Sequence, residues 1–282
     1  MIAPQEPAAA VSLADAVWLG LVEGFTEFLP VSSTGHLIVA NRLLGIGESP
    51  LTIGIQFGAI SAILVLYWRR LWDALRRARP AQLRSEPNLL VQIVVAAAPA
   101  ALLGLVGDKW LEAHLFTAEF VAGTMTVGGV LLLWLDRHLA TTAAAAGSGG
   151  GSDLAAMRYR TALAIGAFQC LALLPGTSRS AATIAGALLL GLSRTAAAEF
   201  SFLVGLPILY GACGVKLLHA WRMVSGPLLW PMVVGTGVAF LTALVVVRPF
   251  VAFLRANTFA PFAIYRIAAG LLLALGCATG WL

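Results

Sequence analysis

Apolar residues in this chain come in runs close to the roughly twenty that a helix needs to cross a bilayer. These runs predict six spans: Leu51–Trp68, Leu89–Val106, Phe120–Leu135, Ala196–Leu218, Leu228–Val247 and Pro261–Leu282. Two further apolar segments, 13–44 and 159–192, are each interrupted by a polar island that contains a proline. Each half of such a segment is too short to span at about 1.5 Å of rise per residue. We therefore predict two re-entrant helical hairpins with non-helical backbone at their tips, which must line a cavity at bilayer depth.

An internal repeat relates the two hairpins. A shift of 145 residues places Leu29–Thr34 on Leu174–Arg179. Three spans, an odd number, separate the hairpins, so the second half is expected to lie upside down relative to the first, as in transporters. The predicted fold class is an all-α integral membrane protein with an inverted repeat, six transmembrane helices and two re-entrant hairpins whose tips meet. The repeats are residues 1–139 and 158–282. Residues 140–157, of which 140–152 are low-complexity, are expected to be a flexible linker.

Composition agrees with a bilayer location. Hydrophobic residues make up 60% of the chain and charged residues 11%, against about 25% charged in soluble domains. The net charge of +5 comes from basic residues in predicted loops, which favours the positive-inside rule over nucleic-acid binding. If the loop with Arg69, Arg70, Arg76, Arg77, Arg79 and Arg84 is cytoplasmic, twelve of the 18 basic residues lie inside. The mouth of the first hairpin then faces outward.

Two carboxylates, Glu23 and Glu27, share one helix face just before the first tip. Ionisable groups in such apolar surroundings are costly and indicate function. Neighbouring like charges repel in a low dielectric unless a cation neutralises them, and a hard divalent ion such as Mg²⁺ or Ca²⁺ prefers oxygen ligands. We interpret Glu23 and Glu27 as a metal site or an acid–base pair. The alternative is a structural hydrogen bond between one protonated and one ionised carboxylate.

The polar islands stand directly before two predicted helices, which begin near Gly35 and Ala181. Free N–H groups and the helix dipole make such positions anion sites, although the same residues also serve as N-caps. Arg179 has no acid in its own hairpin, and a guanidinium matches phosphate bidentately. We expect the two islands to form one phosphate site clamped by Arg179, with substrate contacts from Ser32, Thr34, Gly176, Thr177, Ser178, Ser180 and Gln56.

Two other polar residues have competing interpretations. His36 follows Ser33 by about one turn, so it is a candidate to move a proton or to attack phosphorus. The alternative is a histidine hydrogen-bonded to helix backbone. Glu199 lies five residues after Arg194, and we expect a structural charge pair there. The single cysteines Cys170, Cys213 and Cys277 suggest core packing.

The segment Glu23-Gly-Phe-Thr-Glu27-Phe-Leu-Pro-Val-Ser-Ser-Thr-Gly-His36 resembles the first signature motif of the undecaprenyl-diphosphate phosphatase family, the bacitracin-resistance type. Pro175-Gly-Thr-Ser-Arg179-Ser resembles the second, with Ala181 where the family usually has glycine. Glu199-Phe-Ser-Phe-Leu and Pro261-Phe-Ala-Ile-Tyr-Arg266 extend the resemblance to nearly the whole chain. It implies an inner-membrane hydrolase that removes the terminal phosphate of undecaprenyl diphosphate and so regenerates the lipid carrier for cell-wall synthesis; bacitracin sequesters that substrate.

By motif position, the resemblance implies catalytic roles for Glu23, Glu27, Ser33, His36 and Arg179. Either Ser33 attacks the terminal phosphorus, or water does so with Glu27 or His36 as base. The expected partners are the lipid substrate and the bilayer, with a homodimer as a candidate assembly and no nucleic acid. A rival interpretation is a transporter or flippase of a polyprenyl phosphate or another anion, in which the carboxylates bind a coupling ion. A lipid-binding scaffold leaves the concentration of ionisable groups unexplained.

Overall fold

The computed structural model describes residues 11–46, 50–78, 87–146, 152–154, 157–220 and 226–282. In these ranges the chain is helical apart from turns and one isolated bridge between Ser152 and Leu192. The helices long and apolar enough to cross a membrane are α6 (Leu89–Leu115), α7 (Ala118–Ala146), α10 (Arg194–Ala220), α11 (Leu229–Leu254, preceded by the short η3, Gly226–Leu228) and α12 (Ala260–Ala278). The bent pair α3 and α4 adds a sixth span if it is taken as one. The chain is thus an all-α, multi-pass membrane protein, as predicted.

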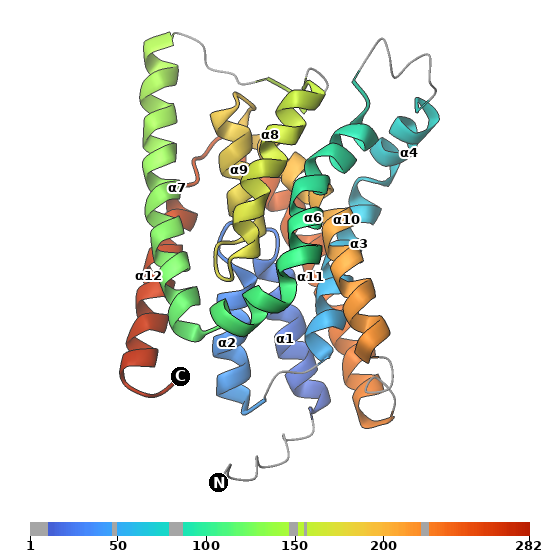
Figure 1. The fold of residues 1–282 in the computed structure, drawn as a ribbon, viewed down its shortest axis with the longest axis vertical. Helices are drawn as coiled ribbons and strands as arrows, with labels where there is room; N and C mark the ends of the chain where they lie inside the picture. The colour runs from blue at the N-terminus through green and yellow to red at the C-terminus, as the bar shows by residue number, and fades with distance from the viewer. Residues whose placement is uncertain (1–10, 47–49, 79–86, 147–151, 155–156, 221–225) are drawn as a thin grey trace.

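Two helical hairpins enter this bundle from opposite ends (Figure 1). The first consists of α1 (Leu13–Thr26) and α2 (Ser33–Leu44), and the second of α8 (Tyr159–Gln169), η2 (Cys170–Leu173) and α9 (Arg179–Leu189). The tips meet in the interior, where the Ser180 hydroxyl donates to the carbonyl oxygen of Leu29 at 2.8 Å. The expected meeting of the two tips is therefore confirmed.

The first hairpin is held in the bundle by close backbone packing. Ser12 caps α1 in a capping box with Asp15, which defines where the hairpin begins. Gly20 faces α11 so closely that a Cβ there would lie 2.6 Å from the carbonyl oxygen of Gly235. Gly24 meets Thr242 of the same helix in the same way. Small residues that let helices approach are the usual device of membrane packing, and here they bring the end of α1 into the protein interior.

The first predicted span ends early. Helix α3 (Leu51–Leu66) is followed after Tyr67 by α4 (Trp68–Arg76), which is bent by 64° relative to it. The prediction of a basic loop is therefore wrong for Arg69, Arg70 and Arg76, which lie on α4; Arg79 and Arg84 are outside the described residues. Stacking of Trp68 on Trp72, with Arg76 over the Trp72 ring at 5.3 Å, supports this helical turn.

Helix limits differ slightly from expectation around the tips and the linker. Helices α2 and α9 each begin two residues before the positions near Gly35 and Ala181 that the sequence suggests. Helix α7 continues to Ala146, past the predicted repeat limit at residue 139. Residues 147–151 and 155–156 of the predicted linker lie outside the described residues. The division into two repeat domains and the linker's flexibility stay predictions.

Candidate active site

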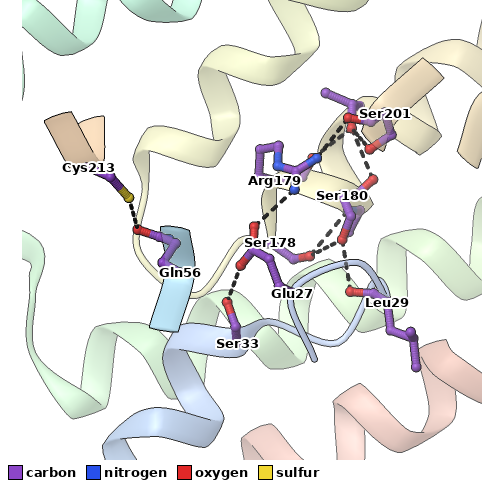
Figure 2. A network of polar contacts seen from close by, with 11 residues as sticks. Glu27, Leu29, Ser33, Gln56, Ser178, Arg179, Ser180, Ser201 and Cys213 are labelled. Atoms are coloured by element: carbon purple, nitrogen blue, oxygen red, sulfur yellow. Dashed lines mark hydrogen bonds and ion pairs between the residues drawn. The ribbon is translucent and has the colours of Figure 1, made fainter. Parts of the chain in front are cut away.

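An ion pair between the two hairpins forms the centre of the site (Figure 2). Arg179 Nη2 donates to Glu27 Oε1 at 2.9 Å, and both side chains are at least nine-tenths buried. Glu27 follows the last residue of α1, whereas Arg179 opens α9. The acid that Arg179 lacks in its own hairpin thus comes from the other hairpin. A buried charge without its partner is strongly unfavourable, so each tip needs the other.

The second oxygen of Glu27 accepts a hydrogen bond from Ser33. The Ser33 Oγ to Glu27 Oε2 distance is 2.7 Å, and the contact is visible in Figure 2. Ser33 is the first residue of α2, so it stands where free backbone N–H groups favour an anion. A hydroxyl bonded directly to a carboxylate is the arrangement of a nucleophile and its general base. The structure therefore joins three of the predicted catalytic residues in one chain of contacts.

Helix α10 shapes the other side of Arg179. Arg179 Nη1 donates to the carbonyl oxygen of Ser201 at 2.7 Å, while its buried Nε has no hydrogen-bond partner in the described structure. A Cβ at Gly205 would lie 2.6 Å from Nη1, so only glycine leaves room for the guanidinium there. Sequence reasoning did not place Ser201 or Gly205 in the site. The signal available was weak, namely a serine two residues after Glu199 in an apolar helix.

Both tips carry a serine in a strained backbone conformation. Ser32 has φ 73° and Ser178 has φ 71°, a region that non-glycine residues seldom occupy. Each is the residue before its helix. The Ser178 hydroxyl caps α9 by accepting from the backbone N–H of Ala181 at 3.2 Å, as the capping interpretation requires. The Ser32 hydroxyl is buried and has no protein partner among the described atoms, so it is free to face a ligand.

The second tip is braced from behind by α12 and α7. Arg266, fully buried, donates to the carbonyl oxygens of Gly176 at 2.8 Å and Thr177 at 2.5 Å. It also donates from Nε to Met125 at 3.0 Å. Thr124 completes the brace with a 2.6 Å bond to the carbonyl oxygen of Pro175. Arg266 was not predicted as a site residue, although a guanidinium in the middle of an apolar span was a usable signal.

His36 has partners of its own. Its Nδ1 lies 2.7 Å from the carbonyl oxygen of Ser32, and its Nε2 lies 2.7 Å from the hydroxyl of Tyr265. Because a carbonyl only accepts, Nδ1 carries a proton, and Nε2 of the neutral ring accepts from Tyr265. The backbone-bonded alternative for His36 is thus realised. A direct role of His36 in the reaction stays a prediction.

The other residues that the sequence predicted to bind substrate have different hydrogen-bond partners in the structure. Ser180 lies 3.0 Å from Ser178, hydroxyl to hydroxyl, and links the tips through Leu29. Gly176 and Thr177 present carbonyls to Arg266, and Thr34 is half-buried in the first turn of α2. Gln56 Oε1 accepts from the thiol of Cys213 at 3.6 Å, a long contact. Binding of substrate by these residues stays a prediction.

Glu23 is the group in this site that best fits a cation. It is fully buried, and neither carboxylate oxygen has a hydrogen-bond partner in the described structure. It lies one turn before Glu27 on α1. Carboxylate and hydroxyl oxygens are the donors that Mg²⁺ and Ca²⁺ take, so the donor set fits the expected ion. Among the described residues no group of three or more His, Cys, Asp or Glu side chains gathers as a metal cluster, so two carboxylates are the acidic ligands on offer.

Ion pairs outside the site correct one expectation. Glu199 does form a charge pair, but with Arg70 of α4 at 2.6 Å rather than with Arg194. Arg194 instead pairs with Asp136 of α7 at 3.3 Å. Spacing along one helix suggested the wrong partner because the opposite charges come from α4 and α7, which are distant in sequence.

Comparison with known proteins shows which family this chain resembles. The family model described as bacitracin resistance protein BacA matches residues 16–272. A protein of Verminephrobacter eiseniae named undecaprenyl-diphosphatase is 42% identical over 275 residues, which cover 96% of this chain and 97% of that one. Proteins of the same name from Nitratidesulfovibrio vulgaris and Sphingopyxis alaskensis are 44% and 43% identical, covering 90% and 92% of this chain and 94% and 95% of theirs.

Proposed function

We propose that this chain, which belongs to the family of the bacitracin resistance protein BacA, is an undecaprenyl-diphosphate phosphatase. It hydrolyses the terminal phosphate of a polyprenyl diphosphate and so recycles the lipid carrier used in cell-wall synthesis. The observation that carries this proposal is the double engagement of Glu27. One oxygen binds the Arg179 guanidinium and the other accepts the Ser33 hydroxyl, at the buried meeting point of two helix N-termini.

The contact geometry favours Ser33 as the nucleophile. Its hydroxyl proton passes to Glu27 while Oγ bonds to the terminal phosphorus, and the bond from that phosphorus to the bridging oxygen breaks. Polyprenyl monophosphate leaves, and the proton held by Glu27 passes to the departing oxygen, which returns Glu27 to its carboxylate form. Water then attacks the phosphoserine, which releases inorganic phosphate and restores Ser33. A general base within hydrogen-bond reach of the nucleophile is the geometric requirement for this step, and the 2.7 Å contact meets it.

Charge on the transferred phosphoryl group needs stabilisation in the transition state. Arg179 offers its unpartnered Nε, and the first turns of α2 and α9 offer backbone N–H groups. Glu23 and Glu27 would hold a divalent cation, which would neutralise phosphate charge when bound. If the ion pair between Arg179 and Glu27 loosens during the reaction, the negative charge of the substrate replaces that of Glu27 as the partner of the guanidinium.

A water nucleophile is the competing route for the same reaction. Glu27 is again the base in reach of the site, and His36 is the alternative. His36 is less suited than Glu27 to act as the base, because both of its ring nitrogens already have hydrogen-bond partners, Nδ1 in Ser32 and Nε2 in Tyr265. The two routes differ in one observable species, since only serine attack forms a phosphoenzyme.

The proposed location is the bacterial inner membrane, with the active site open to the outer side. Arginines of α4 lie at one end of the bundle, where α6 begins and α7 ends, and the first hairpin enters from the other end (Figure 1). The positive-inside rule makes the arginine-rich end cytoplasmic. A substrate left on the outer leaflet after wall synthesis then reaches the site through the first hairpin. A homodimer stays a prediction.

A transporter of polyprenyl phosphate or another anion is the second candidate. It is favoured by the entry of the two hairpins from opposite ends of the bundle, the plan in which alternating access occurs. In that case the Glu27–Arg179 pair binds cargo, and no phosphate is released.

The test is phosphate release from a polyprenyl diphosphate by detergent-purified protein, with and without EDTA. Glu27→Gln and Arg179→Ala are compared with the exposed Arg255→Gln, which lies at the end of α11. Metal-dependent release that the first two variants lose and the third keeps supports the phosphatase. No release by folded protein that still binds the lipid points to the transporter.

A further inference from the structure

A cavity of about 380 Å³ lies between the first hairpin, α7, α12 and the C-terminal segment. Figure 1 shows the C-terminal end of the chain beside α2. Apolar side chains form its walls, among them Val22, Val39 and Leu43 of the hairpin and Leu272 of α12. The exception is the hydrogen-bonded pair His36 and Tyr265. The cavity is therefore an apolar space with one polar end.

The polar end of this cavity adjoins the candidate active site. His36 lies on the first turn of α2, which begins with Ser33, and its Nδ1 bonds to the carbonyl oxygen of Ser32. Less than one helical turn, which rises about 5.4 Å along the axis, thus separates His36 in the cavity lining from the proposed nucleophile. A molecule with its charged head at Ser33 and an apolar chain can place that chain directly in the cavity.

The chain's last two residues close one side of the cavity. Trp281 and Leu282 are both in its lining, and their backbone N–H groups fold back to the carbonyl oxygen of Gly276. Arg42, at the end of α2, donates from Nε to the carbonyl oxygen of Trp281 at 2.7 Å. The first hairpin therefore holds this wall in place, which makes the cavity a built feature of the same hairpin that carries Ser33.

We propose that this cavity binds the first isoprene units of the substrate's hydrocarbon chain and so selects an isoprenoid over a free diphosphate. The inference rests on the proposed phosphatase function and deepens it. At roughly 30 Å³ for a group the size of a water molecule, the cavity holds about a dozen such groups, the size of two to three isoprene units of five carbons each. Transfer of these units from the bilayer or detergent into a shaped pocket gains packing contacts. The remainder of a long chain extends into the membrane.

The discriminating variant fills the cavity without touching the polar site. Ala269→Trp places an indole in the lining, and Ala268→Trp is its matched control, since Ala268 is the exposed neighbour on α12 and outside the lining. Phosphate release is measured with inorganic diphosphate, which has no isoprene unit, and with farnesyl diphosphate, which has three. We expect Ala269→Trp to reduce kcat/KM for farnesyl diphosphate at least tenfold, mainly through KM. The inorganic diphosphate value and both values of Ala268→Trp stay within about twofold of wild type.

Two results overturn the cavity proposal. One is an equal change for both substrates in Ala269→Trp, which indicates a disturbed active site. The other is no change for either substrate, which means that the cavity holds only a bilayer lipid. Trp281→Ala is a second variant that opens the wall, and it should raise KM for farnesyl diphosphate severalfold with kcat retained. The cavity is also overturned if this variant leaves KM unchanged.

A binding measurement separates failure of the cavity from failure of the phosphatase. A methylene-bridged analogue of farnesyl diphosphate is titrated calorimetrically into wild type, Ala269→Trp and Ala268→Trp. If wild type hydrolyses neither diphosphate but Ala269→Trp alone loses analogue binding, the phosphatase is wrong and the cavity stands. If all three proteins bind the analogue equally, the cavity is wrong whatever the activity.

Discussion

Ser33 and Arg179 occupy equivalent positions in the two opposed hairpins, and each binds a different oxygen of the same carboxylate. Each is the first residue of its helix, at position 33 in α2 and at 179 in α9, a shift of 146 residues. Ser33 donates to Glu27 Oε2 and Arg179 to Oε1. The repeat has thus placed a candidate nucleophile on one tip and a cation on the other. The preceding residues, Ser32 and Ser178, share the strained positive φ.

Removal of the inter-hairpin cation should abolish activity and loosen the tips. Arg179→Ala leaves Glu27 buried without its ion pair, a change that typically destabilises by about 3–5 kcal/mol. Loss of one charge-stabilising donor also lowers kcat by about a hundredfold or more. Arg179→Lys keeps the positive charge but lacks the planar guanidinium that binds two oxygens at once. Relative to Arg179→Ala, it should therefore recover more of the thermal stability than of the activity. Phosphate release and thermal unfolding in detergent check both effects, and equal recovery of the two by lysine would contradict the clamp.

Substitution of Glu23 should change the dependence of activity on a divalent cation. If it ligates Mg²⁺ or Ca²⁺, Glu23→Gln raises the metal concentration for half-maximal activity at least tenfold, because an amide is a weaker ligand. The same variant should be as stable as wild type or more stable in EDTA, since it no longer buries an unpartnered carboxylate. Metal titration of phosphate release and thermal unfolding with EDTA measure the two. Full activity of wild-type protein after exhaustive chelation would count against the ion.

A phosphoserine decides between the two nucleophiles. With Ser33 as nucleophile, acid quenching during turnover should trap phosphate on the peptide that contains it, detectable by mass spectrometry. Ser33→Ala should then lose roughly a thousandfold or more in kcat. Thr34→Ala, one residue along α2 and half-buried, is the matched control and should lose far less. Rapid turnover by Ser33→Ala would instead establish the water route.

The arginine behind the second tip should act on geometry rather than on phosphate. Arg266→Gln removes donors to the carbonyls of Gly176 and Thr177, so the tip moves away from the first hairpin. We expect a tenfold or larger fall in kcat, lower thermal stability and little change in KM. Arg255→Gln, at the exposed end of α11, is the control and should match wild type. A KM effect alone would indicate that Arg266 contacts substrate instead.

A single methyl group should displace the clamp. Gly205→Ala sets a Cβ 2.6 Å from Arg179 Nη1, closer than atoms pack, so the guanidinium must shift from Glu27 or from Ser201. We expect at least a tenfold loss of kcat with secondary structure retained. Gly211→Ala on the same helix is the control, because a Cβ there meets nothing within 4 Å. Unchanged activity of Gly205→Ala, measured by phosphate release, would show that Arg179 is not held as tightly as its contacts indicate.

Much of the architecture could be predicted because membrane folding leaves a clear one-dimensional signal. Backbone polar groups must be satisfied within each helix, so apolar runs mark spans and interrupted runs mark hairpins. The charged tips were visible for the same reason, since Glu27, Arg179 and their neighbouring hydroxyls stand out against apolar surroundings. Their convergence also followed, because an odd number of spans inverts the second hairpin.

Other features depended on contacts between residues far apart in the chain. The sequence shift of 145 aligned Ser33 with Ser178, but the helix starts align it with Arg179, because backbone conformation rather than residue type defines the equivalence. Glu199 pairs with Arg70, which lies on α4 beyond the 64° bend from α3, a tertiary contact that local spacing does not encode.

By itself, then, the sequence determined the fold class, the two hairpins and the set of polar groups at their tips, because each rests on local composition and periodicity. Only the tertiary structure decided which group each one meets. In that structure Glu27 contacts both Ser33 and Arg179. Arg266 lies behind the second tip, and His36 is hydrogen-bonded to Tyr265. Those choices depend on helix packing within the interior, where close approach at residues such as Gly205 and Gly20 determines which side chains come into reach.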